Sequence, residues 1–125
     1  MKKTIVLIFV LVVAGTLAAA PEVIPTAGGP LEIRLLGHAT LMLRFQGRVI
    51  HVDPWSQVAD YSTLPKADLV LITHHHGDHL DASAVSLLRK PGTFVYCTRM
   101  AAARLPGSTI LGSGQAVLRF GIRIQ

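Results

Sequence analysis

Side chains of the types that bind transition metals lie close together near the middle of the chain: His74, His76, Asp78 and His79. They follow the apolar and β-branched run Leu69–Thr73, a pattern typical of a buried strand. Because alternate residues of a strand point to one side, His74 and His76 can bind one cation together. A glycine at position 77 allows the sharp turn that directs Asp78 and His79 toward a second cation. Imidazoles with one carboxylate suit zinc, with iron or manganese as alternatives, so we interpret the segment as the loop of a two-metal hydrolase.

The same segment could instead be a solvent-exposed, histidine-rich loop between a strand and a helix. Its position favours the metal loop, because α/β proteins place their sites at the carboxyl ends of strands. Cys97 is the single cysteine of the chain and lies in an apolar segment, so we expect it to be buried and to serve packing. A single cysteine also excludes a disulfide within the chain.

The rest of the pattern predicts strands first, then alternating strands and helices, then strands again, which is an α/β (α+β) order. The expected strands are Glu32–Leu36, Ala39–Phe45, Arg48–Val52, Leu69–Thr73, Thr93–Thr98, Ser108–Leu111, Ala116–Phe120 and Ile122–Gln125. The expected helices are Ala82–Leu88, with Asp81 as its N-cap, and Arg99–Leu105. Gln46-Gly47 is expected to be a two-residue hairpin turn.

The N-terminus has the pattern of a secretory signal peptide over residues 1–20. Lys2 and Lys3 precede the apolar run Ile5–Val13, and small residues follow up to Pro21. This predicts export to the periplasm or the medium, with an uncleaved membrane anchor over Thr4–Ala20 as the alternative. After cleavage no stable membrane association is expected. Residues 21–30 are rich in proline and glycine and are expected to be a leader or linker.

The charge of the chain gives little support to nucleic-acid binding. The 125 residues include 12 basic and 7 acidic side chains, and two of the basic ones are the lysines of the signal peptide. The remaining basic residues are mostly single arginines without a run or interleaved aromatics. The expected partner is therefore a small-molecule substrate, and a chain of this length is at most one ordinary domain.

Three motifs together resemble the metallo-β-lactamase-fold hydrolases: Gly37-His38-Ala39-Thr40, Val52-Asp53-Pro54 and the segment Ile72–Asp81. The resemblance covers Leu31–Gln125 and is nearest to the branch that contains ascorbate-phosphate lactonases and related uncharacterised hydrolases. Phospholipase-D-type enzymes that release N-acylethanolamines share parts of the pattern. The fold that this implies is a four-layer αβ/βα sandwich with a dinuclear site on the rim between two sheets. Residues 31–125 would supply about its first half.

The resemblance also implies a role for each matching residue. His74 and His76 would bind the first of two zinc ions, and Asp78 and His79 the second. Asp53 would support the metal loop by hydrogen bonding, because ligating histidines need a partner for the other ring nitrogen; the alternative is a turn-former ahead of Pro54. Two further side chains are candidates for the substrate side, His38 and Tyr61, with a turn cap and simple packing as the respective alternatives.

The activity implied is hydrolysis of a lactone, ester or phosphoester by a metal-bound hydroxide, with Asp78 as a possible proton acceptor. The family's remaining ligands come from the second half of the sandwich, and nothing after Asp81 matches them. We therefore expect this chain to be part of a protein about twice as long, and to be inactive alone. The alternative is a non-catalytic or degenerate half-domain that binds metal.

Overall fold

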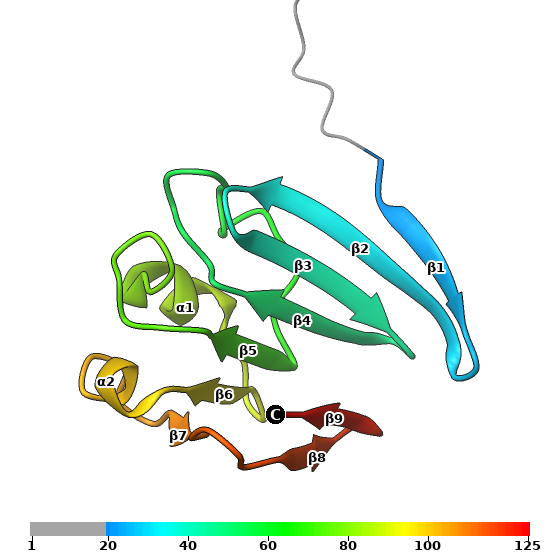
Figure 1. Cartoon of the computed structure of the whole chain (residues 1–125). Helices are drawn as coiled ribbons and strands as arrows, with labels where there is room; N and C mark the ends of the chain where they lie inside the picture. The colour runs from blue at the N-terminus through cyan, green and yellow to red at the C-terminus, as the bar shows by residue number, and fades with distance from the viewer. Residues whose placement is uncertain (1–19) are drawn as a thin grey trace, which may run out of the picture.

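The computed structural model describes residues 20–125, in which seven strands form one mixed sheet and two further strands form a separate hairpin (Figure 1). The strands are β1 (Glu22–Thr26), β2 (Gly29–Gly37), β3 (Thr40–Phe45), β4 (Arg48–Val52), β5 (Leu69–Ile72), β6 (Phe94–Cys97), β7 (Thr109–Ile110), β8 (Val117–Arg119) and β9 (Ile122–Ile124). The helices are α1 (Ala82–Leu88) and α2 (Arg99–Ala102). The predicted signal peptide lies, except for Ala20, outside the described residues.

Strands β1 to β4 are consecutive and antiparallel, whereas β4 to β7 are parallel and connected by crossovers. The predicted turn between β3 and β4 is confirmed: Gln46 and Gly47 have φ of 48° and 75°, and Phe45 pairs with Arg48. Two positive φ values match the twist that a two-residue hairpin needs. The parallel half places the carboxyl ends of β4, β5 and β6 at one edge, which is where the metal loop begins.

Residues 22–26 form an edge strand, where the sequence analysis expected a linker. β1 pairs along β2 from Glu22 opposite Ile33 to Thr26 opposite Gly29. The two-residue turn, residues 27 and 28, leads into Gly29, which has φ of 111° and whose carbonyl accepts a hydrogen bond from the Thr26 hydroxyl at 2.5 Å. Prolines are tolerated on an edge strand because the missing N–H costs no ladder bond there. The open edge of β2 thus orders a segment whose composition is typical of a linker.

The two helices cover one face of the parallel strands. Val70 and Ile72 of β5 point into a core cluster with Ala84, Val85 and Leu88 of α1. Asp81 caps α1 as predicted, accepting hydrogen bonds from the backbone N–H groups of residues 83 and 84 at 3.0 and 3.1 Å. α2 is shorter than predicted, because the chain continues after Ala102 in turns closed by the bonds from Arg104 N to Ala101 O and from Leu105 N to Ala102 O.

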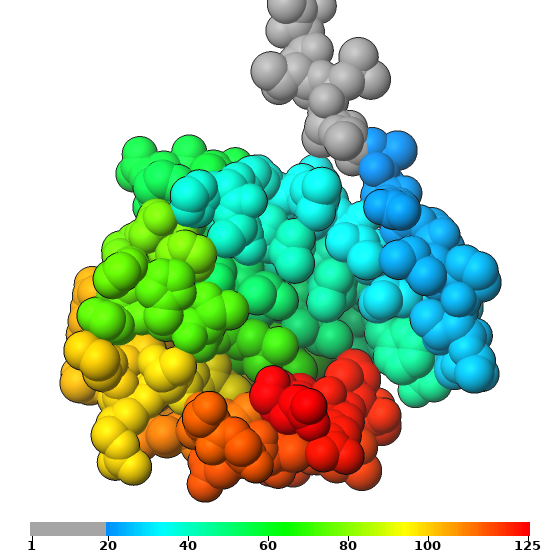
Figure 2. All heavy atoms as spheres, in the orientation of Figure 1, coloured from blue at the N-terminus to red at the C-terminus, as the bar shows by residue number. Residues whose placement is uncertain are grey.

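The opposite face is covered in part by the β8–β9 hairpin. Leu69 belongs to a second cluster with Ile50 and Tyr96, against which Ile122 and Ile124 of the hairpin pack. Figure 2 shows the end of the chain, in red, lying against the green strands at the centre of the sheet. Among the described residues, no helix combines the length and the apolar character needed to cross a membrane.

Candidate metal centre

The metal loop leaves β5 at Ile72 and turns back through a short hydrogen-bonded segment. The His76 carbonyl accepts hydrogen bonds from His79 N at 3.0 Å and from Leu80 N at 2.8 Å. Leu80 is fully buried beneath the loop, in the same core cluster as α1. The loop is therefore held at both ends, by β5 and by a buried leucine, and its histidines lie between these anchors.

Asp53 is buried beside this loop and makes three side-chain hydrogen bonds to it. Its carboxylate accepts from Thr73 N at 2.8 Å and from the Thr73 hydroxyl at 2.6 Å, and one oxygen lies 2.7 Å from His79 Nδ1. Since Nδ1 is engaged with Asp53, the Nε2 atom of His79 is the nitrogen left to face a cation. The geometry thus couples the end of β4 to the orientation of one predicted ligand.

Thr40 and Thr73 are two supporting residues that the sequence analysis missed. Thr40 is completely buried, and its hydroxyl donates to the Asp53 carbonyl at 2.7 Å. Thr73 donates twice to the Asp53 carboxylate and lies 3.1 Å from His74 Nδ1. In the sequence, Thr40 begins a strand and Thr73 directly follows another, and each lies within two residues of a histidine. This position next to candidate ligands is the signal that could have identified them.

The histidines of the loop lie side by side. The ring centroid of His74 is 3.9 Å from that of His79 and 4.7 Å from that of His76. The ligand atoms of three residues, His38, Asp78 and His79, all lie within 4.8 Å of one another. In residues 20–125 this is the one group of three donors close enough to share a cation. It contains the predicted pair Asp78 and His79, and adds His38 from the turn between β2 and β3.

His38 is hydrogen bonded to Asp78 across the site. Its Nε2 atom lies 2.8 Å from Asp78 Oδ2, and its ring contacts those of Trp55 and His79 with centroids 5.4 and 5.5 Å apart. The hydrogen bond with His38 holds the pKa of Asp78 below its usual value. Asp78 is therefore an anion at neutral pH, which is the state in which a carboxylate binds a cation.

Asp81 joins the metal loop to the segment after β4. Besides capping α1, it accepts hydrogen bonds from the backbone N–H of Ser56, at 3.0 Å, and from the Ser56 hydroxyl. Burial raises the pKa of the Asp81 carboxyl, but the hydrogen bonds from Ser56 and Ser83 outweigh it and hold the pKa well below the ordinary value. This contact fixes Trp55, the neighbour of Ser56, beside His38.

Tyr61 lies in the hydrophobic core. It therefore has the packing role that the sequence left as the alternative, and it does not face a substrate. Its side chain is 1% exposed, and its hydroxyl accepts a hydrogen bond from Trp55 N at 2.9 Å. The segment between β4 and β5 folds over the helix-covered face, which carries the ring inward. Tyr61 thus supports Trp55 from below. His75, predicted not to be a ligand, is half-buried, and its carbonyl accepts from Arg104 at 3.0 Å.

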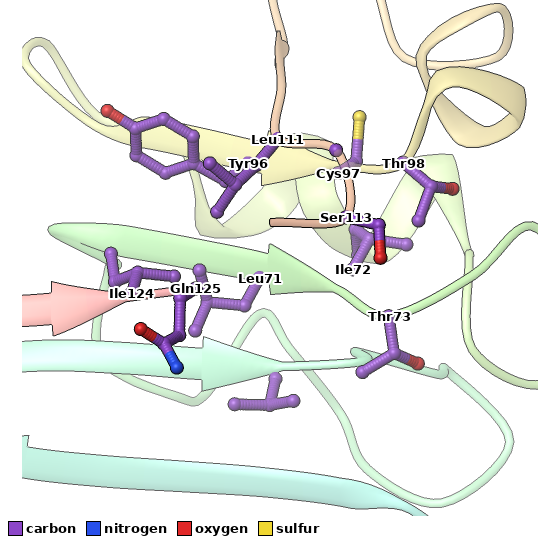
Figure 3. Close-up of a pocket in the computed structure, with 12 residues that line it drawn as sticks. Leu71, Ile72, Thr73, Tyr96, Cys97, Thr98, Leu111, Ser113, Ile124 and Gln125 are labelled. Atoms are coloured by element: carbon purple, nitrogen blue, oxygen red, sulfur yellow. The ribbon is translucent and has the colours of Figure 1, made fainter. Parts of the chain in front are cut away.

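A cavity of about 470 Å³ adjoins the loop on the face of the sheet opposite the helices (Figure 3). Its apolar lining includes Leu71, Tyr96 and Leu111. Figure 3 shows the hydroxyl groups of Thr73 and Thr98 at the end nearest the strand termini. Because Thr73 also bonds Asp53, the cavity and the metal loop share one residue. Cys97 is buried beside the cavity, with Sγ 3.3 Å from Ser108 Oγ.

Residues 32–118 match the model of the family described as "Beta-lactamase superfamily domain". The chain belongs to this superfamily. Among curated superfamily relatives, it is 42% identical over 64 residues to a UPF0173 metal-dependent hydrolase of Hyperthermus butylicus, a match that covers 46% of this chain and 27% of the relative. It is also 42% identical over 74 residues to a UPF0173 metal-dependent hydrolase of Cupriavidus necator, covering 51% and 25%.

Two solved structures of similar fold carry comparable descriptions. A protein of Parabacteroides distasonis described as a metal-dependent hydrolase is 37% identical with a TM-score of 0.76, over 78% of this chain and 45% of its own. The metallo hydrolase Igni18 of Ignicoccus hospitalis is 26% identical with a TM-score of 0.55, over 70% and 42%. These comparisons confirm the predicted fold class. The chain spans less than half the length of the proteins it matches.

Proposed function

We propose that this chain is the metal-binding N-terminal part of a β-lactamase-superfamily hydrolase that uses two zinc ions. The observation that carries the proposal is that the ligand atoms of His38, Asp78 and His79 all lie within 4.8 Å of one another, beside the carboxyl end of β5. The hydrogen bond between His79 Nδ1 and the Asp53 carboxylate adds to it, because such a bond fixes which ring nitrogen a metal-binding histidine presents. The names of the relatives give independent support.

Each ligand has a role in this proposal. His74 and His76 hold one ion, and Asp78 and His79 hold the other. Two imidazoles with a carboxylate are a donor set that zinc favours, with iron or manganese as alternatives. The chemistry that such ions supply when bound is activation of water and stabilisation of negative charge on a carbonyl or phosphoryl oxygen. Asp53 keeps the His79 ring oriented throughout.

Asp78 is a metal ligand in this proposal, and the sequence also makes it a possible proton acceptor. Its pKa is lowered, first of all by the hydrogen bond with His38. A carboxylate with a lowered pKa has less tendency to take up a proton at neutral pH, whereas its negative charge favours a cation.

The proposed substrate is a small lactone, ester or phosphoester. The motifs that resemble the ascorbate-phosphate lactonase branch support a lactone or phosphoester over a β-lactam. The cavity beside the loop offers apolar side chains together with the hydroxyls of Thr73 and Thr98, which suits a small molecule of mixed polarity. The signal-like N-terminus supports export of the protein, which N-terminal sequencing of the secreted form tests.

The experiment is a zinc titration of the metal-free chain, followed by hydrolysis assays with a lactone, a phosphodiester and a β-lactam. We expect zinc binding in the wild type, loss of about one ion in His76→Ala, and unchanged binding in the matched variant His75→Ala. Hydrolysis of one substrate class that a chelator abolishes supports the enzyme. Zinc binding without hydrolysis is expected of this chain alone. The alternative, a non-catalytic metal-binding half-domain, is supported if a longer protein that contains this chain also hydrolyses none of the three substrate classes. Unchanged zinc content in His76→Ala refutes the ligand assignment.

A further inference from the structure

His38 lies beside two predicted metal ligands, Asp78 and His79, although it is far from the metal loop in sequence. It lies in the turn between β2 and β3, 40 residues before Asp78, and its Nε2 atom is 2.8 Å from Asp78 Oδ2. On the other side of that oxygen, His79 Nε2 lies 3.6 Å away. All three residues offer one ligand atom to the same small volume.

The separations between these atoms suit a single tetrahedral cation. Two ligand atoms about 2.1 Å from a tetrahedral zinc ion lie about 3.4 Å apart. The distances of 2.8 and 3.6 Å from Asp78 Oδ2 bracket that value. The ligand atoms of His38 and His79 lie within 4.8 Å of each other, so a shift of about an ångström is enough to place both imidazoles and the carboxylate around one ion.

The backbone at His38 is built to present this side chain. His38 has φ of 51°, in the left-handed region that non-glycine residues rarely adopt and that is enriched at functional sites. The preceding Gly37 has φ of 127°, and a Cβ there would meet Val58 Cβ at 3.1 Å. Just after the turn, Thr40 bonds the Asp53 carbonyl. The turn is thus tied to the residue that orients His79.

A turn-capping role explains the position of His38 less well. In residues 20–125, the hydrogen bond of its imidazole crosses to Asp78 and does not return to its own turn. The ring also packs against Trp55, which the bonds between Ser56 and Asp81 hold in place. The contacts of His38 therefore all lead toward the metal loop and the segment that borders it.

We propose that His38 is a third protein ligand of the ion held by Asp78 and His79. This inference rests on the proposed metal centre and deepens it. His38 would raise the number of ligands that this chain gives to the ion from two to three, and three protein ligands with a fourth position open is the arrangement of catalytic zinc sites. His38 would bind through Nε2, the atom that now faces Asp78. The turn between β2 and β3 then becomes part of the metal site.

The test is ¹⁵N NMR of the histidine side chains in the whole 125-residue chain, with zinc added. The His38 Nε2 signal, assigned by its loss in His38→Gln, should move to the shift of a metal-bound nitrogen and stop responding to pH. If the His79 Nε2 signal moves and the His38 signal stays that of a free or hydrogen-bonded imidazole, His38 contacts only Asp78 and the inference is overturned.

A zinc titration of two matched variants gives a second reading. His38→Gln should weaken binding of one of the two ions by about tenfold or more, and His75→Gln should leave both affinities unchanged. Wild-type affinities in His38→Gln overturn the inference alone, because the loop histidines still bind. Absence of zinc binding in the wild type instead overturns the proposed metal centre. The NMR reading on the wild-type chain does not depend on how well the variants fold.

Discussion

Two buried aspartates lie at opposite ends of the central strands, and their partners differ in kind. Asp68, just before β5, accepts from Val49 N at 2.9 Å and pairs with Lys90 at 2.9 Å and Arg48 at 3.3 Å. Asp53, just after β4, is bonded to Thr73 and His79 and, within residues 20–125, to no lysine or arginine. The charge of Asp68 is thus balanced within the fold.

The negative charge of Asp53 faces a histidine of the metal loop, with no lysine or arginine beside it in residues 20–125. The one titratable partner of its carboxylate among the described residues is His79, whose other nitrogen faces Asp78 and His38. A cation bound beside His79 would balance the charge of Asp53, as Lys90 and Arg48 balance the charge of Asp68. The Asp68 end of the strands therefore has a structural role, whereas the Asp53 end is suited to bind a cation. Substitution of Asp53 should therefore weaken both stability and metal binding, whereas substitution of Asp68 should affect stability alone.

The largest effect is expected from Asp53→Ala. It leaves the part-buried Thr73 N–H and the His79 ring without their partner, so the free energy of unfolding of the metal-free protein should fall by about 3 kcal/mol. Zinc affinity should fall by about 10- to 100-fold as well. Urea denaturation and zinc titration measure the two effects. Retention of wild-type affinity would contradict the orienting role of Asp53.

A pH effect of similar size is expected from His51, which lies on β4 between the two ends. Burial lowers the pKa of His51 to about 4, while its Nε2 lies 3.1 Å from the Pro65 carbonyl. As the pH falls below about 6.5 the unfolded chain takes up a proton before the folded one, so stability falls until about pH 4. The total loss should be about 3 kcal/mol.

Urea denaturation across this pH range measures the loss. In His51→Gln, which can keep the bond to Pro65, the decrease between about pH 6.5 and 4 should be smaller by about that amount. The same decrease in both proteins would show that another group causes it.

Asp68→Asn should have a smaller effect, and on stability alone. It removes the ion pairs with Arg48 and Lys90, which are partly exposed, so a loss of about 1 kcal/mol is expected at neutral pH. Burial raises the pKa of Asp68, but the hydrogen bonds from Val49 and Lys90 outweigh it and lower the pKa overall. Its stabilisation is therefore complete at neutral pH and disappears as the pH falls below about 4.

Denaturation of Asp68→Asn at pH 7 and at pH 3 tests the direction: the difference from the wild type should narrow at the lower pH. Zinc affinity should not change. Weaker zinc binding in this variant would remove the distinction between the two ends of the sheet.

The smallest effect is expected from Ser56→Ala. The substitution removes the hydroxyl bond to Asp81 but keeps the backbone bond, so stability should fall by about 0.5–1 kcal/mol. Trp55 is the single tryptophan of the chain, so its fluorescence reports directly on the position of this segment. An unchanged emission spectrum would show that the hydroxyl bond does not hold Trp55 beside His38.

Local patterns in the sequence predicted most elements near the site. The turn at Gln46-Gly47 and the cap at Asp81 follow from residue types within a few positions, and both are confirmed. β1 was missed because its order depends on the open edge of β2, which its own composition of proline and glycine does not reveal. The role of Tyr61 does not follow from the sequence, because only the packing of the long connection between β4 and β5 decides which way the ring faces.

The long-range contacts of the site were the least predictable. The histidine loop could be found from its spacing, since a few adjacent residues carry the chemistry. The approach of His38 to Asp78 spans 40 residues and depends on the left-handed backbone at the turn. The support from Thr40 through Asp53 likewise requires β3 and β4 to be paired first. Sequence spacing identifies candidate ligands, whereas the fold shows which of them meet.

The number of zinc ions bound by the purified chain tests the central claim most directly. Titration of the metal-free wild type, monitored by calorimetry, should show two sites. His76→Ala and Asp78→Ala should each lose one site, and Asp68→Asn should keep both. Equal stoichiometry in all four proteins would contradict the assignment of the metal centre to this edge of the sheet.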